Sequence, residues 1–318
     1  MLCKICGNVE QNKLHVAREM MFGFKDEFNY VECVQCGCLQ LAAIPKDMTK
    51  YYPATYYSYA TPGSLGSILR RQRASYAQNR LNLLGGVVAY LFGADNALHS
   101  IARLKLSKNA RVLDVGCGSG GLLSNLRRMG YENLTGLDPF LPSDTEARGM
   151  RLLKKELIEL EGEFDAIMLH HTFEHMEEPA QVLKQLNRLL SSGGTIILRI
   201  PLCDSYAWKH YGVNWYQLDA PRHFFLHTIA SMAILAKEAN LCIARTIYDS
   251  TLLQFIGSEQ YMRGISQEDQ RSYIKNPFRS IFTVNDIRSF HCRALQLNKD
   301  NKGDSACFYL RKIHNMEL

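Results

Sequence analysis

From about residue 105 onward, short apolar runs of strand length alternate with segments whose apolar residues recur at helical spacing. The apolar runs predict strands at 112–115, 134–138, 151–153, 164–170, 195–200 and 243–248, and a last strand-like run at 306–310. The amphipathic segments predict helices at 122–129, 179–190 and 229–239. These repeated strand–helix units predict an α/β fold with a doubly wound parallel sheet, which binds its ligand at the carboxyl ends of the strands.

A glycine-rich turn, GCGSGG at 116–121, lies between the first predicted strand and the first predicted helix. Glycines let the backbone turn sharply and approach a ligand closely, and the following helix points unpaired N–H groups at that ligand. The turn therefore favours a nucleotide site. Because Gly116, Gly118 and Gly121 also satisfy the G-x-G-x-x-G pattern, NAD and a turn without any ligand remain alternatives.

Two acidic residues narrow the choice of nucleotide. Asp138 ends the second predicted strand, where a carboxylate suits the ribose hydroxyls of either cofactor. Asp114 precedes the turn within the first strand, where its carboxylate would repel a pyrophosphate but can meet the amino group of a methionine-like moiety.

With these residues the sequence resembles the class I S-adenosylmethionine-dependent methyltransferases over residues 105–250, because their first motif reads much like DVGCGSG. The resemblance implies a Rossmann-like methyltransferase sheet whose last strand returns as an antiparallel hairpin edge. It also implies that the methionine end of the cofactor lies over the glycine turn, the ribose at Asp138 and the adenine after the third strand. The cofactor-binding residues are then Asp114, Gly116, Cys117, Gly118, Gly120, Asp138, Pro139, Glu156, Leu157 and His170.

The composition is that of an ordinary globular protein. The chain has 318 residues, 47% of them hydrophobic, which is enough for a sizeable core and two domains. A net charge of +6 falls short of the concentrated basic surface of a nucleic-acid-binding protein. The amino terminus lacks the apolar core of a signal peptide, and the apolar segment 83–92 is about half of the ~20 residues that a membrane helix needs. We therefore expect a cytoplasmic monomer or homodimer with no membrane span.

Ten cysteines without a secretory signal favour metal binding over disulfides. Two C-x-x-C-G knuckles, which can face one another around a tetrahedral zinc ion, are formed by Cys3, Cys6, Cys33 and Cys36. Four thiolates close the coordination shell, so we expect a structural zinc ion, with Cys38 as a spare thiol. The pattern predicts a small zinc-binding ribbon at 1–45 that needs its metal to fold.

We expect residues 46–104 to form a connector that leads to a methyltransferase domain at 105–318. The connector is rich in tyrosine, at positions Tyr51, Tyr52, Tyr56, Tyr57 and Tyr59. Their rings either pack the zinc module against the next domain or line a polar substrate groove. The arginine-rich amphipathic segment 69–84 predicts a helix that caps a domain, with a membrane-surface helix as the alternative.

A first histidine cluster follows the fourth predicted strand, where His171, Glu174 and His175 read H-x-x-E-H. This spacing resembles the inverted zinc-protease motif, but that motif needs a helix and these residues follow a strand. It also resembles a quinone O-methyltransferase pattern, Glu-x-x-Glu-His, whose acids and histidine are proposed to hold a divalent ion. Because His171 replaces the first glutamate, metal use stays open, as does a simpler role in which Glu174 and His175 cap and orient the loop.

A second cluster lies in a predicted substrate loop at 203–227, which holds both tryptophans and the run APRH at 220–223. An aromatic, histidine-rich insertion over the carboxyl edge of a sheet is suited to grip a substrate. A pair of zinc knuckles before a methyltransferase domain, together with this histidine, resembles the deoxysugar C-methyltransferases, in which Tyr-x-Glu-His supplies the base. Here the histidine matches while the tyrosine and glutamate do not, which favours O-methylation.

The acceptor of a methyl group must lose a proton, and histidine is suited to take it because its pKa lies near neutrality. We expect His223 as the base, followed by His175 and His171, while Arg222 either binds an anionic substrate or forms a structural ion pair. The sequence thus predicts a methyltransferase acting on a sugar, a sugar nucleotide or a related small molecule, at oxygen.

Two alternatives to that reaction are C-methylation of a nucleotide-linked deoxysugar and RNA methylation that uses the ribbon. RNA is disfavoured because Lys and Arg do not crowd the ribbon and the fourth strand lacks an Asn/Asp-Pro-Pro-aromatic run.

Overall fold

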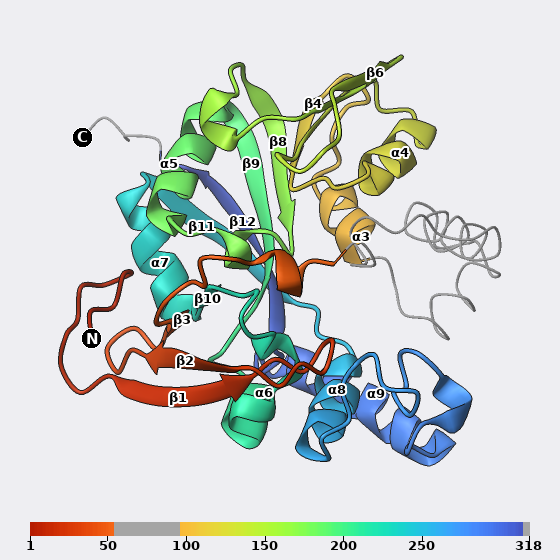
Figure 1. The fold of residues 1–318 in the computed structure, drawn as a ribbon. Helices are drawn as coiled ribbons and strands as arrows, with labels where there is room; N and C mark the ends of the chain where they lie inside the picture. The colour runs from red at the N-terminus through yellow and green to blue at the C-terminus, as the bar shows by residue number, and fades with distance from the viewer. Residues whose placement is uncertain (54–95, 314–318) are drawn as a thin grey trace.

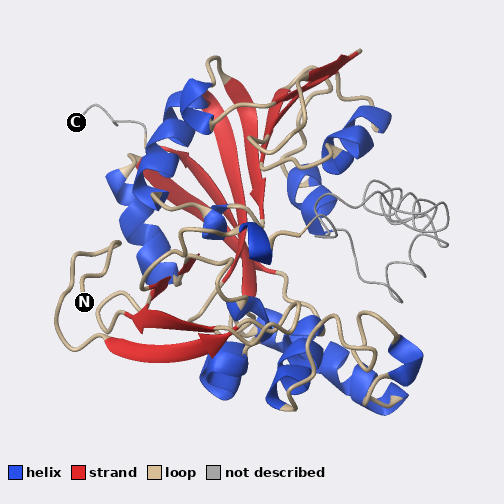
Figure 2. Cartoon of the chain, in the orientation of Figure 1, coloured by secondary structure: helices blue, strands red, loops and turns tan. Residues whose placement is uncertain are grey.

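The computed structural model describes residues 1–53 and 96–313 and arranges them around a large twisted sheet with a small sheet beside it (Figures 1 and 2). Within the described residues, the strands of the large sheet follow the order β11 (Leu241–Tyr248), β12 (Ser305–Lys312), β9 (Leu190–Pro201), β8 (Phe164–His170), β4 (Arg111–Val115), β5 (Asn133–Leu137), β7 (Met150–Leu153), β6 (Thr145–Ala147). The strands from β9 to β7 run parallel, as the alternating pattern predicts.

Strand β12 is antiparallel, but it lies inside the sheet and not at its edge. It pairs with β9 on one side and with β11 on the other, so that β11 forms the edge. The expectation of an edge at 306–310 is therefore wrong in position. The physical reason is that this run, ACFYL, has no polar residue on alternate positions. Its side chains are buried on both faces of the sheet, and a strand inside the sheet provides that burial better than an edge strand.

Helices cover both faces of the large sheet. Figure 1 shows α5 (Pro179–Leu189) and α7 (Ile229–Glu238) on one face, with α3 (Asn96–Ala102) and α4 (Gly121–Arg128) on the other. Helix α5 begins at a proline and buries Leu183, Leu186 and Leu189 along one stripe, which is the spacing that predicts it. The serines and glycines at 191–194, expected as a connection, belong instead to the start of β9.

Three further helices lie near the small sheet: α6 (Tyr206–Tyr211), α8 (Leu253–Met262) and α9 (Val284–Lys299). Sequence patterning did not predict α8 and α9. Helix α8 was missed because it is buried on nearly every side and so lacks a polar stripe. For α9, the sequence signal is only a capping box between Thr283 and Asp286.

The small sheet joins the N-terminal segment to the predicted substrate loop. Its antiparallel strands are, in order, β1 (Lys13–Arg18), β2 (Glu27–Glu32), β3 (Leu39–Leu41) and β10 (Phe225–Leu226). Strand β10 comes from the loop at 203–227, and it pairs Phe225 with Gln40 and Leu226 with Leu39. The N-terminal module, residues 1–53, is thus completed by a strand from the second half of the chain.

One hydrophobic core also runs through both parts. The cluster that contains Tyr30 and Leu39 of the N-terminal module contains Leu169 and Phe173 beside the large sheet. A second cluster, with Leu98 and Leu123, lies under α3 and α4. Among the described residues, every helix is too short or too polar to cross a lipid bilayer. Tyr56, Tyr57, Tyr59 and the segment 69–92 lie outside the described residues.

Candidate active site

The glycine turn connects β4 to α4 in a backbone conformation that only glycine adopts easily. Gly116, Gly118 and Gly120 have φ angles of +74°, +51° and +74°. A Cβ atom at Gly116 would overlap the side chain of Thr172, so the turn also packs directly against the end of β8. The local sequence therefore places a tight turn at the carboxyl edge of the sheet, and its backbone is held there because the Gly116 N–H donates to the Leu137 carbonyl at 2.7 Å and the Gly120 N–H to the Cys117 carbonyl at 2.9 Å.

Asp138 closes this turn from the neighbouring strand. Its Oδ2 accepts a hydrogen bond from the Gly118 N–H at 2.9 Å, and its Oδ1 accepts one from the Phe140 N–H at 3.0 Å. Asp114 is buried nearby, and burial, followed by the charge of Asp138, raises its pKa to about 7. A cation placed here would relieve both effects, so the two carboxylates fit the positively charged methionine end of S-adenosylmethionine.

The remaining predicted cofactor residues line the same edge. Cys117 is in the turn and Pro139 follows Asp138, while Glu156 and Leu157 lie after β7, at the start of the short helix η2 (Leu157–Glu159). His170 ends β8, and within the described residues both of its buried ring nitrogens lack a hydrogen-bond partner. Burial, aided by Arg199, lowers the pKa of His170 to about 3, so its ring is neutral and can donate to or accept from a ligand.

The N-terminal cysteines form a second candidate site. The Sγ atoms of Cys3 and Cys36 are 3.6 Å apart and those of Cys6 and Cys33 are 3.5 Å apart. All four sulfurs lie within 4.8 Å of one another, near the ~3.8 Å separation expected for thiolates at tetrahedral zinc. This donor set fits a structural zinc ion. Cys38 is buried outside the cluster, as expected of a spare thiol.

Two tight turns hold the four sulfurs in place. The Gly7 N–H donates to the Cys3 carbonyl at 2.9 Å, and the Gly37 N–H donates to the Cys33 carbonyl at the same distance. Both glycines have positive φ, which explains why each knuckle ends in glycine.

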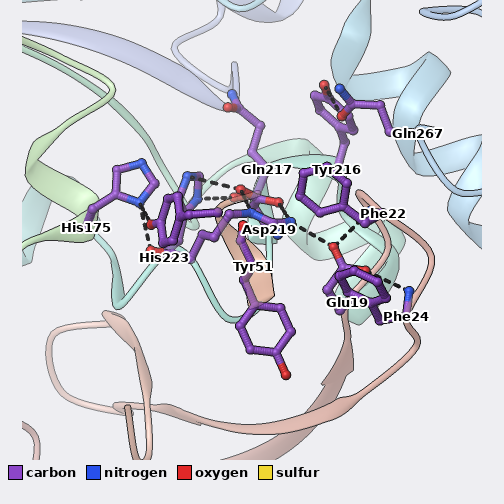
Figure 3. Close-up of polar contacts among 12 residues, drawn as sticks. Glu19, Phe22, Phe24, Tyr51, His175, Tyr216, Gln217, Asp219, His223 and Gln267 are labelled. Carbon is purple, nitrogen blue, oxygen red and sulfur yellow. Dashed lines mark hydrogen bonds and ion pairs between the residues drawn. The ribbon is translucent and has the colours of Figure 1, made fainter. Parts of the chain in front are cut away.

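His175 and His223 come together where η3 meets the segment 217–223 (Figure 3). His175 ends the short helix η3 (Phe173–His175), and its ring meets that of His223 edge to face at 4.7 Å between centroids. The Nδ1 of His175 lies 2.7 Å from the Arg222 carbonyl, and the Nδ1 of His223 lies 2.8 Å from the Gln217 carbonyl. Because a carbonyl only accepts, each Nδ1 donates its proton there, and in the neutral form of either ring the lone pair is on Nε2.

Carboxylates flank the Nε2 of His223. It lies 3.9 Å from the Glu174 Oε1 and 3.8 Å from the Asp219 Oδ2. Burial alone would raise the pKa of Glu174, but the hydrogen bond from His171 and the neighbouring histidines outweigh it and lower that pKa to about 2. A proton arriving on His223 would therefore be stabilised by two ionised acids.

His171 belongs to a different contact set. Its Nδ1 donates to the Glu174 Oε1 at 3.1 Å, and its Nε2 accepts from Arg199. Arg199 is in turn paired with Asp249 at 2.5 Å. The lone pair of His171 is thus occupied, which makes this residue a poor base, although its positive φ of 52° shows a backbone held in an unusual conformation at this edge.

The contacts of Arg222 and of the two tryptophans show what these residues of the loop 203–227 do. Arg222 is fully buried and paired with Glu19 and Asp219, so it forms the structural ion pair and does not face a substrate. Trp215 is buried with its indole N–H on Asp304 at 2.9 Å, and Trp208 packs against His15. Both tryptophan rings therefore pack the loop against the rest of the protein, and a substrate grip by this loop would have to come from its other residues.

Two metal-type donor groups exist within the described residues: the four cysteines and the trio Glu174, His175 and His223. His171 is outside the trio, so the three residues of the H-x-x-E-H motif do not converge on one point.

Tyr51 and Tyr52 of the predicted connector make different contacts. The buried Tyr51 packs on Phe28 in the N-terminal module, whereas the Tyr52 hydroxyl lies 3.3 Å from the His175 Nδ1.

Sequence reasoning missed Glu19, Tyr30 and Asp219, which contact the His223 segment. Asp219 had a usable signal, since it precedes Arg222 and His223 at spacings typical of a turn. Glu19 and Tyr30 had none, because they lie in another part of the chain.

The parallel sheet with an inserted antiparallel β12 and the glycine turn after β4 are the features expected of a class I S-adenosylmethionine-dependent methyltransferase domain. Residues 89–245, about half of the chain, match a family model described as a methyltransferase domain.

The chain is 35% identical over 151 residues to the ubiquinone biosynthesis O-methyltransferase of Dechloromonas aromatica, covering 41% of this chain and 64% of the relative. It is 32% identical over 111 residues to the enzyme of the same name from Xanthomonas oryzae pv. oryzae, covering 30% and 45%. The chain thus spans less than two thirds of the length of these relatives.

Among solved structures, the cyclopropane synthase CmaA1 complexed with SAH and CTAB matches with a TM-score of 0.44 and 16% identity, covering 69% of this chain and 82% of that one. The mitomycin 7-O-methyltransferase MmcR matches with a TM-score of 0.41 and 10% identity, covering 79% and 56%.

Proposed function

We propose that the protein transfers the methyl group of S-adenosylmethionine to a hydroxyl oxygen of a sugar or sugar-derived small molecule, with His223 as the general base. The observation that carries this proposal is the His223 Nε2, which holds a lone pair between Glu174 and Asp219. Glu174 lies in η3, and that short helix begins directly after Thr172. Thr172 packs against Gly116 of the glycine turn. This chain connection supports a base on the same side of the sheet edge as the glycine turn.

In this proposal, one group of residues holds the cofactor and another takes the proton of the acceptor. The turn from Gly116 to Gly120, with Asp114 and Asp138, would hold the cofactor. When bound, S-adenosylmethionine supplies a methyl group already activated on a sulfonium. His223 takes the proton of the acceptor hydroxyl on Nε2, while Nδ1–H stays on the Gln217 carbonyl and keeps the ring oriented. Glu174 and Asp219 stabilise the imidazolium that forms.

The choice of oxygen rests on two supports. The curated relatives are named O-methyltransferases, and the run at 220–223 lacks the tyrosine and glutamate of the sugar C-methyltransferase pattern. The sugar class rests on the cysteine knuckles before the methyltransferase domain, together with His223. C-methylation of a nucleotide-linked deoxysugar is the alternative, because Glu174 and Asp219 place acids beside His223 even though Arg222 stands where that pattern has glutamate.

The proposal is tested by incubating the purified protein with S-adenosylmethionine labelled in its methyl group. Acceptors are offered in three sets: sugars and sugar nucleotides, catechols and other phenols, and total RNA. We expect label in the first set, on oxygen, and its loss in His223→Ala. Label only in RNA, or labelling of a sugar that survives His223→Ala undiminished, would overturn the acceptor class or the base, respectively.

A further inference from the structure

The position of the His223 segment is fixed from the N-terminal module by a contact to its backbone. Tyr30, in β2, is fully buried, and its hydroxyl donates a hydrogen bond to the His223 carbonyl at 2.9 Å. The contact joins a rigid strand directly to the residue that carries the base. It leaves the His223 ring free to use both of its nitrogens.

A second contact reaches the same segment through a buried carboxylate. Glu19 is fully buried and accepts hydrogen bonds from the Phe22 N–H at 2.9 Å, from the Phe24 N–H at 3.0 Å and from the Arg222 Nη2 at 3.1 Å (Figure 3). The first two bonds fold the turn after β1. The third connects that turn to the residue immediately before His223.

Arg222 transmits this contact to the rest of the segment. Its guanidinium has no exposure and bonds to Asp219 through Nε at 2.9 Å and Nη2 at 2.5 Å. It also donates to the Tyr51 carbonyl at 3.3 Å and lies over the Phe22 ring. Because a buried charge is costly when it loses a partner, the guanidinium is confined to this place. Asp219, Arg222 and His223 then move only as one unit.

We propose that Glu19 and Tyr30 are positioning residues for His223, and that the N-terminal module is part of the machinery for proton transfer. This inference rests on the proposed role of His223 as base. It gives the N-terminal module a role beyond the structural one expected of its cysteine cluster. The competing explanation is that both residues only stabilise the fold. That explanation predicts a lower melting temperature with an unchanged kcat in the fraction that remains folded.

The first test replaces Tyr30 by Phe, which removes one hydroxyl and keeps the buried ring. The matched control is Tyr309→Phe, because the buried Tyr309 hydroxyl likewise donates to a backbone carbonyl, that of Ser100 at 3.0 Å, and this bond involves neither the N-terminal module nor the His223 segment. We expect kcat to fall by roughly 3- to 10-fold in Tyr30→Phe, the scale of one lost hydrogen bond. The KM for S-adenosylmethionine should be unchanged, and the control should keep wild-type kcat.

The second test replaces Glu19 by Gln. The matched control is Glu27→Gln, since Glu27 lies in the same module but forms an exposed ion pair with Arg18. We expect kcat to fall by about 10- to 100-fold in Glu19→Gln, because a small displacement of a catalytic group has effects of that size. If Glu19→Gln does not fold, Tyr30→Phe decides the question.

A spectroscopic test does not require the acceptor. In protein labelled with ¹⁵N-histidine, the His223 ring signals are identified by their loss in His223→Gln. The wild type should show a single tautomer with the proton on Nδ1, and Tyr30→Phe or Glu19→Gln should shift or mix that tautomer while both controls superimpose on the wild type. An unchanged His223 signal in both variants would overturn the inference. If no acceptor is ever methylated, the proposed function fails, and this measurement still decides the inference.

Discussion

The cofactor half and the proton-transfer half of the candidate site are built in different ways. The centre of the cofactor half consists of β4, the glycine turn, α4 and the end of β5, all within residues 111–138, while Glu156, Leu157 and His170 follow or end the nearby strands β7 and β8. The proton-transfer half combines η3 and the segment 217–223 with Glu19 and Tyr30 of the N-terminal module. One half is centred on a single local unit, and the other exists only when distant segments pack together.

This difference predicts that the two halves fail separately. Damage to the N-terminal module should disturb His223 and leave the glycine turn intact, because no contact of the turn described above involves that module. Damage to the turn should weaken cofactor binding and leave the His223 contacts in place. The following changes test this separation, from the largest expected effect to the smallest.

Removing the metal ligands should have the largest effect. In Cys33→Ser/Cys36→Ser, bound zinc should be lost and the N-terminal module should unfold, because metal binding supplies much of the folding free energy of so small a module. Turnover should become undetectable while the affinity for S-adenosylmethionine stays near the wild-type value. Metal analysis, circular dichroism and calorimetry measure these properties, with the exposed Cys292→Ser as control. A metal-free, fully folded module would contradict the zinc assignment.

Truncating the base comes next. His223→Ala should lower turnover on the order of 10²–10⁴-fold, the usual contribution of a positioned general base. Cofactor affinity should hardly change, and neither should thermal stability. His210→Ala, at an exposed position of the same loop, is the matched control. If turnover stays near normal, the role passes to His175, which carries the neighbouring lone pair.

Asp138→Ala tests the other half. It should weaken S-adenosylmethionine binding by a few kcal/mol at most, the scale of lost charge-assisted hydrogen bonds, with turnover at saturating cofactor affected less. Calorimetric titration measures the change against the exposed Asp300→Ala. Unaltered affinity would remove Asp138 from the cofactor site.

The pH dependence of stability should report on two buried histidines, His170 at the end of β8 and His227, which directly follows β10. Burial lowers the pKa of His170 to about 3 and that of His227 to about 4, from 6.5. Between pH 6.5 and about 4 the unfolded chain therefore binds more protons than the folded one, so the free energy of unfolding rises with pH and falls on acidification. We expect a loss of roughly 4 kcal/mol from pH 7 to pH 5 in urea unfolding, about half of it from each ring. A flat profile over that range would show that the two rings are not held neutral.

The sequence predicted the strands, the glycine turn and the helix that build the proposed cofactor half, because their signals are local. The apolar run at 164–170 coincides with β8, and the turn residues lie where their spacing places them. The proton-transfer half was predicted only as far as its histidines. Arg222 lies 203 residues after Glu19, and no short-range pattern links them. The burial of Trp215 could not be predicted, because an aromatic residue in a loop gives the same pattern whether it faces a substrate or the core.

A crystal structure with S-adenosylhomocysteine bound tests the central claim most directly, because one experiment locates both halves. The account predicts the ligand over Gly116 to Gly120 with its ribose on Asp138, and the His223 Nε2 lining the space beside the ligand sulfur. A ligand bound elsewhere, or a His223 ring turned away from that sulfur with Glu19 and Tyr30 still in contact with its segment, would contradict it.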